Sequence, residues 1–98
     1  MAKRPIRFHP LAADEADDAR LWYFARNPHI SQLFFEALDV AVLSIAESPR
    51  RWPRVYGKYR RYMLRTFPFS VVYVERAEHI EVIAVAHHRR RPGYWKKR

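Results

Sequence analysis

The hydrophobic pattern of this chain changes its period once, at a segment rich in proline and arginine, residues 49–58 (PRRWPRVYGK). Before this segment, apolar residues recur at helical spacing over residues 11–26 and 30–48. After it, apolar and polar residues alternate, which predicts three strands at residues 59–66, 69–76 and 80–87. A helical first half followed by a strand-rich second half is typical of the α+β class.

The flanking segments and the proline-containing breaks complete this prediction. Residues 5–8 form a short strand candidate with Ile6 and Phe8 on one face. Asn27-Pro28 and Ser48-Pro49 end the two helices, because the residue before a proline avoids helical backbone angles. Residues 49–58 are expected to be a loop, and residues 82–86 are apolar on both faces, which places the last strand centrally. The predicted order is β-α-α-β-β-β, with two N-terminal helices packed on a mainly antiparallel sheet.

The composition supports one folded domain of residues 1–98. Hydrophobic residues make up 49% of the chain and aromatic residues 15%, which is enough for a single core. The chain has no cysteine, so it has neither disulfide nor thiolate chemistry, and a cytoplasmic location is expected. No uninterrupted apolar run approaches the ~20 residues of a membrane helix, so no membrane partner is expected.

The net charge of +9 is concentrated in the second half of the chain. Residues 1–49 hold five Lys and Arg against seven Asp and Glu, a balance of −2, and residues 50–98 hold fourteen against three, a balance of +11. Residues 89–98 form a basic tail. An electropositive half of this kind predicts an anionic partner, either nucleic acid or an acidic protein segment.

Histidines are the first candidates for metal ligands in the basic half. His87 and His88 are adjacent on the last predicted strand, so their side chains point to opposite faces and do not chelate one ion together. The acidic residues lie mostly in the other half, and two glycines are too few for a phosphate-cradling loop. The sequence therefore predicts neither a metal site nor a cofactor.

The same histidines are candidates for acid–base chemistry. Imidazole titrates near neutral pH, and metal-free RNA cleavage needs a base, an acid and cations over the phosphate. The candidate catalytic residues are Arg61, His87, Arg89 and Tyr94. The alternative is that a histidine at a strand end only hydrogen-bonds to nearby backbone.

Further basic and aromatic residues are candidates for binding an anionic ligand. Arg61 and Arg65 share a face of the predicted strand about 13 Å apart, and with Arg89 they would line a groove for phosphates. The other binding candidates are His88, Arg90, Arg91 and Trp95. Two alternatives stay open: the arginines form a solvated surface without a ligand, and Trp95 folds back to cover an edge of the core.

Several motifs together resemble a known family. They are RFHPLAADE in the first helix, RRYMLRTFPFSVVYV in the predicted hairpin and IAVAHHRRRPGYW at the end. In these motifs the chain resembles the RelE/ParE superfamily of toxins from type II toxin–antitoxin modules, in particular its ParE-like, plasmid-stabilisation branch. The resemblance covers nearly the whole chain, and the family fold agrees with the predicted order of elements.

The resemblance implies a growth-inhibiting toxin that is neutralised by an acidic, partly disordered antitoxin. Two targets exist within the superfamily: ParE-like members bind DNA gyrase, and RelE-like members cut mRNA on the ribosome without a metal ion. In the nuclease pattern, two lysines fall on Arg61 and Met63, an arginine falls on Ser70, a second arginine falls on Arg89, and a tyrosine falls near Tyr94 or Trp95. Because one lysine and one arginine are missing, the resemblance favours gyrase over mRNA. A basic nucleic-acid-binding protein without toxicity is the remaining alternative.

Overall fold

The computed structural model describes residues 4–98, which form two helices and five strands. The elements are β1 (Ile6–Phe8), α1 (Pro10–Arg26), α2 (Pro28–Glu47), β2 (Arg54–Tyr56), β3 (Tyr59–Met63), β4 (Phe69–Glu75) and β5 (Ile80–His87). The sheet has the strand order β1-β5-β4-β3-β2, in which only the β1–β5 pair is parallel among the described strands. The predicted α+β class, with two helices on a mainly antiparallel sheet, is confirmed, and β5 has a neighbour on each side as expected.

The prediction of a loop throughout residues 49–58 is wrong, because β2 forms within it. Gly57 adopts a φ of 52°, a left-handed conformation that glycine tolerates, and this allows the chain to turn from β2 into β3. β3 is also shorter than expected, since it ends at Met63 and the chain then turns toward β4. Arg65 lies in that turn, so Arg61 and Arg65 do not share a strand face.

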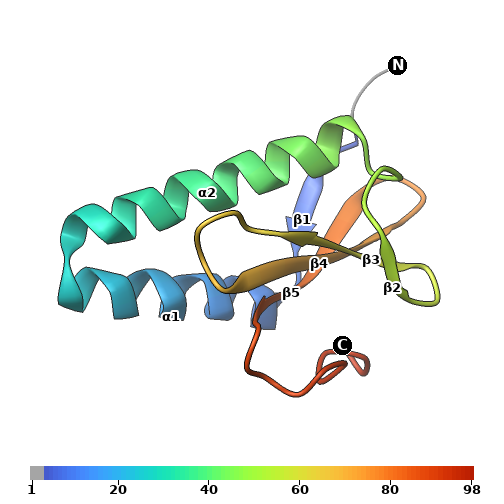
Figure 1. Ribbon diagram of the computed structural model, residues 1–98. Helices are drawn as coiled ribbons and strands as arrows, with labels where there is room; N and C mark the ends of the chain where they lie inside the picture. The colour runs from blue at the N-terminus through green and yellow to red at the C-terminus, as the bar shows by residue number, and fades with distance from the viewer. Residues whose placement is uncertain (1–3) are drawn as a thin grey trace.

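Asn27 links the two helices. It has extended backbone angles, it ends α1 with its N–H bonded to the Tyr23 carbonyl, and its side chain accepts a hydrogen bond of 2.9 Å from the His29 N–H. Pro28 then occupies the first turn of α2, where its missing N–H is tolerated. The helices therefore form an antiparallel hairpin whose closed end extends beyond the sheet (Figure 1).

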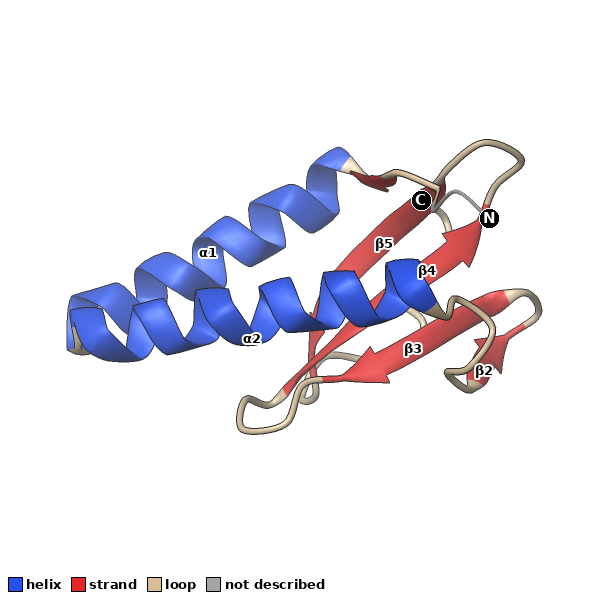
Figure 2. Ribbon diagram, turned by 90° about the horizontal axis from the view of Figure 1, so that it is seen from above, coloured by secondary structure: helices blue, strands red, loops and turns tan. Residues whose placement is uncertain are grey.

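The main core lies between the helical hairpin and one face of the sheet, which we call the helix side (Figure 2). Its centre is a group of aromatic rings whose centroids lie 5.1–6.5 Å apart: Tyr23, Phe34, Phe67 and Phe69. Tyr73 adds a link to the end of α2, because its buried hydroxyl donates a hydrogen bond of 2.6 Å to the Pro49 carbonyl. Burial raises the pKa of Tyr73 to about 12, so this hydroxyl keeps its proton.

A β-bulge in β5 decides which face each of its later residues occupies. Tyr73 pairs with Val82 and Val72 pairs with Ala84, so Ile83 has no partner in β4. Ile83 and Ala84 both lie on the face away from the helices, which we call the tail side, and Val85 returns to the helix side. The bulge also brings His87 opposite Phe69 on the helix side.

The C-terminal tail covers the tail side of the sheet. Trp95 is 6% exposed and packs with Val72, Val74, Ile83 and Ala84 in a second, smaller core. In Figure 1 the tail leaves β5 and turns back under the sheet. The expectation that Trp95 folds back onto a core edge is confirmed.

No membrane-spanning segment was expected from the sequence, but α2 is long and apolar enough to meet a length and composition criterion for one. Over an 18-residue window its mean hydropathy is 1.4, and 22% of that window is buried. In this fold the helix packs against α1 and the sheet through Phe34, Ala41 and Ile45, which are almost fully buried.

We predict that Leu64→Ala lowers the free energy of unfolding by about 2–5 kcal/mol, because Leu64 is 4% exposed within the helix-side core. Urea unfolding followed by circular dichroism measures this change. Met63→Ala is the matched control, since the neighbouring Met63 is 55% exposed and its substitution should change stability by less than about 0.5 kcal/mol. Equal losses in the two variants would contradict the burial of Leu64 beside the exposed end of β3.

Candidate functional site

Glu15 closes an open edge of the sheet. β1 ends at Phe8, so the part of β5 beyond Val82 has no strand beside it on that edge. Glu15, on α1, fills this place: its Oε1 accepts a hydrogen bond of 3.0 Å from the Val85 N–H. A buried strand N–H that has lost its neighbour needs such an acceptor, because an unsatisfied group is costly.

The tail attaches to the same carboxylate. Tyr94 donates its hydroxyl to Glu15 Oε2 at 2.7 Å, Arg98 donates to both oxygens at 2.8 and 2.9 Å, and Arg90 donates at 3.2 Å. Arg98 also donates to the Ile83 carbonyl at 3.0 Å, which lies at the bulge of β5. We call Glu15, Arg90, Tyr94 and Arg98 the Glu15 cluster.

Glu15, Tyr94 and Arg98 have fixed protonation states at neutral pH. Burial alone would raise the pKa of Glu15, but hydrogen bonds from Arg98, Tyr94 and the Val85 N–H outweigh it and lower that pKa below its usual value. Burial and the hydrogen bond to Glu15 raise the pKa of Tyr94, so the phenol stays neutral. The hydrogen bond to Glu15 raises the pKa of Arg98.

Gly93 provides the turn that brings the tail back. Its φ is 77°, a region that side-chain-bearing residues rarely adopt, and a Cβ there would lie 2.6 Å from Lys96 Cε. Successive turns follow, with the Tyr94 N–H bonded to the Arg91 carbonyl and the Lys96 N–H bonded to the Gly93 carbonyl. Tyr94 and Trp95 therefore both face the protein.

A cavity of about 420 Å³, which we call the tail pocket, lies between the tail and the tail side of the sheet. Its cationic lining comes from Arg61 on β3 and from Arg90, Arg91 and Lys96 in the tail. Lys96 Nζ lies 4.1 Å from the ring centroid of Tyr56, which also lines the pocket. Arginine and lysine around one concave surface suit an anionic ligand.

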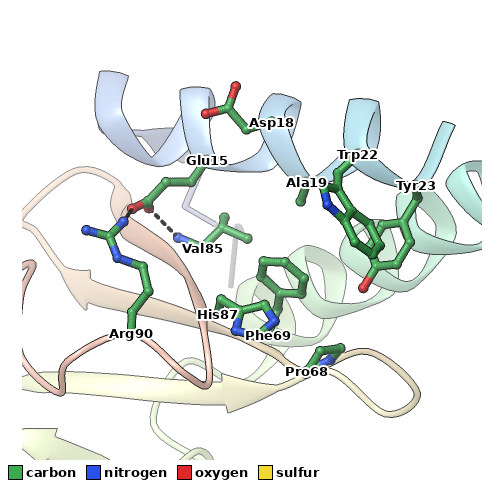
Figure 3. Close-up of a pocket in the computed structure, with 10 residues that line it drawn as sticks. All are labelled: Glu15, Asp18, Ala19, Trp22, Tyr23, Pro68, Phe69, Val85, His87 and Arg90. Carbon is green, nitrogen blue, oxygen red and sulfur yellow. Dashed lines mark hydrogen bonds and ion pairs between the residues drawn. The ribbon is translucent and has the colours of Figure 1, made fainter. Parts of the chain in front are cut away.

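A second cavity of about 530 Å³, which we call the helix-side groove, lies between α1 and the ends of β4 and β5 (Figure 3). Its lining is mainly apolar and aromatic, with Trp22, Tyr23 and Phe69 as the large rings. Figure 3 shows Glu15 and Arg90 paired at one end of this groove and Trp22 at the other. An exposed Trp22 beside an apolar groove is typical of a site that a protein partner covers.

The structure brings together most of the residues that the sequence singled out. Arg61, His88, Arg90, Arg91, Tyr94 and Trp95 all line the tail pocket. Among these residues Arg90 also borders the helix-side groove, and His87 likewise borders both cavities. Arg65 and Arg89 are exposed and do not line either of these cavities.

The two adjacent histidines point to opposite faces, as predicted. The His87 ring packs edge-on against Phe69 at 4.9 Å on the helix side, and its Nδ1 accepts a hydrogen bond of 3.1 Å from the Arg89 N–H. His88 lies on the tail side, where its Nε2 is 2.9 Å from the Ser70 hydroxyl. Among residues 4–98, no three His, Cys, Asp or Glu side chains lie close enough to hold a metal ion.

Sequence reasoning missed Glu15 and Arg98, which hold the site in shape. Glu15 is one of four acidic residues between positions 14 and 18, and no local pattern separates it from Asp14, Asp17 or Asp18. The available signal was charge complementarity, since a basic tail in a small domain needs a carboxylate to hold it against the sheet. That signal indicates the acidic part of the first helix and not the residue.

Apart from the additional β2, the order of elements agrees with the fold expected for the RelE/ParE superfamily. A family model described as the ParE toxin of the type II toxin–antitoxin system parDE matches residues 6–92, so the chain belongs to the ParE toxin family. It is also similar to a solved chain of the chromosomal ParDE toxin–antitoxin system from P. aeruginosa, with a TM-score of 0.75 and 15% identity. That match covers 87% of this chain and 96% of the other. No curated protein matches the chain.

We predict that Glu15→Gln lowers the free energy of unfolding at pH 7 by about 1–3 kcal/mol, because it weakens the charged hydrogen bonds to Arg90 and Arg98. The folded-state pKa of Glu15 is lowered, so the stabilisation by its charge is fully present above about pH 4.5 and is lost as the pH falls through the lowered value. Urea midpoints of both proteins between pH 7 and pH 3 measure the difference.

The gap between wild type and Glu15→Gln should therefore narrow toward pH 3. Asp14→Asn is the matched control, because Asp14 is exposed on the same helix. A gap between wild type and Glu15→Gln that does not change with pH would show that the Glu15 charge does not hold the tail.

Proposed function

We propose that this protein is a growth-inhibiting toxin that acts in the cytoplasm on DNA gyrase and is neutralised by an acidic antitoxin. The observation that carries the choice of target is the state of Tyr94, whose hydroxyl donates to Glu15 and whose raised pKa keeps it neutral. A phenol held in this way is not free to exchange protons with an RNA substrate.

The other candidate catalytic residues are also not all directed toward one point. RNA cleavage requires an acid, a base and cations around one phosphate. Arg61 and His87 both line the tail pocket, but the His87 ring packs against Phe69 on the helix side, and Arg89 lies outside both cavities. This separation supports binding to a target over catalysis.

Two positions that carry cations in the nuclease pattern are uncharged here. Met63 and Ser70 line the tail pocket at these positions, and Ser70 contacts His88. Removing one group that stabilises the transition state typically lowers a rate by about 10²–10³. A chain that lacks two such groups fits the ParE-like mode of action better.

The alternative function, ribosome-dependent cleavage of mRNA without a metal ion, has one observation in its favour. Arg61, His88 and Arg91 line the same cavity, so an imidazole and two guanidinium groups surround a space that a phosphate could enter. If mRNA is the target, His88 in place of His87 is the candidate acid or base.

The antitoxin would use both cavities. Acidic side chains of its segment would pair with Arg61 and Arg91 in the tail pocket, and apolar side chains would enter the helix-side groove beside Trp22 and Phe69. A disordered segment that folds on binding can span two such sites on one small protein.

Induction of the protein in a bacterial host tests the target. We predict arrested growth, relaxed or broken plasmid DNA and continued incorporation of labelled amino acids during the first minutes. Rapid arrest of translation with cuts at defined codon positions would favour the nuclease. Normal growth would contradict toxicity. The remaining hypothesis would then be a basic nucleic-acid-binding protein without toxicity.

We predict that Arg89→Ala relieves growth inhibition with little loss of stability, because Arg89 is exposed next to the two cavities and only its backbone N–H bonds to His87. Colony counts after induction and urea midpoints measure the two effects. Arg7→Ala removes an exposed arginine from β1, which pairs with the start of β5, at the opposite end of that strand from Arg89, and should leave toxicity unchanged. Full toxicity of Arg89→Ala would remove this residue from the site.

A further inference from the structure

A third cavity, of about 350 Å³, lies at the β2 edge of the sheet, apart from the two cavities at the end of β5. We call it the hairpin pocket. Its five lining residues are all charged: Arg50, Arg54, Lys58, Arg60 and Glu75. They come from the segment after α2, from β2, from the turn at Gly57, from β3 and from the end of β4.

The pairing of β2 with β3 places like charges together. Arg54 and Arg60 are direct cross-strand partners, an arrangement that destabilises an antiparallel pair by up to about 1 kcal/mol. All three residues of β2 are exposed, so burial in this strand offsets little of that cost. Departures from the rules of stable folding concentrate at functional positions.

The one carboxylate that lines the hairpin pocket is already paired with arginine side chains. Glu75 accepts hydrogen bonds from Arg4 and from Arg50 Nε, and with these partners it forms two ion pairs. Arg60 donates to the Trp52 carbonyl at 2.7 Å, which fixes its guanidinium group at the pocket. Within residues 4–98, Arg54, Lys58 and Arg60 form no ion pair, so their charges are available to a ligand.

Basic side chains lie on both faces of the sheet near this edge. Adjacent residues of a strand point to opposite faces, and Arg60 lines the hairpin pocket while Arg61 lines the tail pocket. The two basic cavities thus lie on opposite faces of β3. A ligand with regularly spaced negative charges can follow such a track, which is the usual footprint of nucleic acid on a basic protein.

The composition of the hairpin pocket selects among anionic partners. A protein segment would need apolar anchors, and single-stranded nucleic acid would need aromatic side chains for stacking, but the lining has neither. We infer that the hairpin pocket binds backbone phosphates of double-stranded DNA through Arg54, Lys58 and Arg60, without reading its sequence. This inference does not depend on gyrase being the target.

The test is binding of the purified protein to a fluorescent DNA duplex of about 20 base pairs, measured by anisotropy over a series of salt concentrations. The double variant Arg54→Gln/Lys58→Gln should weaken binding on the order of tenfold at about 0.1 M salt. It should also reduce the slope of log K against log salt by about 2, since each phosphate contact contributes about 0.9.

The matched control is Arg7→Gln/Lys97→Gln, which removes two exposed charges outside the hairpin pocket. It should change the slope by less than half as much. An equal change in the two double variants would overturn the inference, because the binding would then follow net charge and not the pocket.

Three further measurements sharpen the outcome. The urea midpoint of Arg54→Gln should equal or slightly exceed that of the wild type, because the repulsion from Arg60 is removed; a large loss would contradict the strained pairing of β2. Tighter binding of single-stranded DNA than of duplex would overturn the choice of ligand. Binding of polyglutamate without binding of the duplex would also overturn it, since that result would assign the pocket to an acidic protein.

Discussion

The attachment of the tail to Glu15 is the interaction on which the rest of this structure depends. One carboxylate accepts hydrogen bonds from the Val85 N–H, Tyr94, Arg90 and Arg98, and so joins the first helix, the open edge of β5 and the C-terminus. Its surroundings lower the pKa of Glu15, so the charge persists at neutral pH. Because the tail is one wall of the tail pocket, the shape of that pocket depends on this carboxylate.

The sheet separates two kinds of surface. On the helix side, the groove beside Trp22 and Phe69 is mainly apolar, and on the tail side the pocket around Arg61 and Arg91 is cationic. The antitoxin that we propose would contact both surfaces, with apolar and acidic groups in one chain. The hairpin pocket adds a third surface at the β2 edge that presents charge alone. Membership of the ParE toxin family accounts for the fold, and these surfaces are the features of this chain that bear on its partners.

Most of the fold could be predicted from local patterns. Hydrophobic periods, together with Asn27-Pro28 and Ser48-Pro49, predict the two helices, the four strands outside residues 49–58 and the position of β5 inside the sheet. β2 could not be predicted, because its three residues are all exposed and carry no hydrophobic pattern. The site was predicted as a group of residues near the end of the last strand, and seven of the nine candidates line the tail pocket, two of which, His87 and Arg90, also border the helix-side groove.

The sequence by itself determined the class of fold and the concentration of positive charge in the second half, because each depends on the type and spacing of nearby residues. Only the tertiary structure decided which face His87 occupies and which carboxylate holds the tail. The bulge at Ile83 reverses which face each later residue of β5 occupies, and this bulge forms through pairing with β4. The choice of Glu15 among four neighbouring acids depends on where β1 ends beside β5, which is a long-range relation that no local pattern contains.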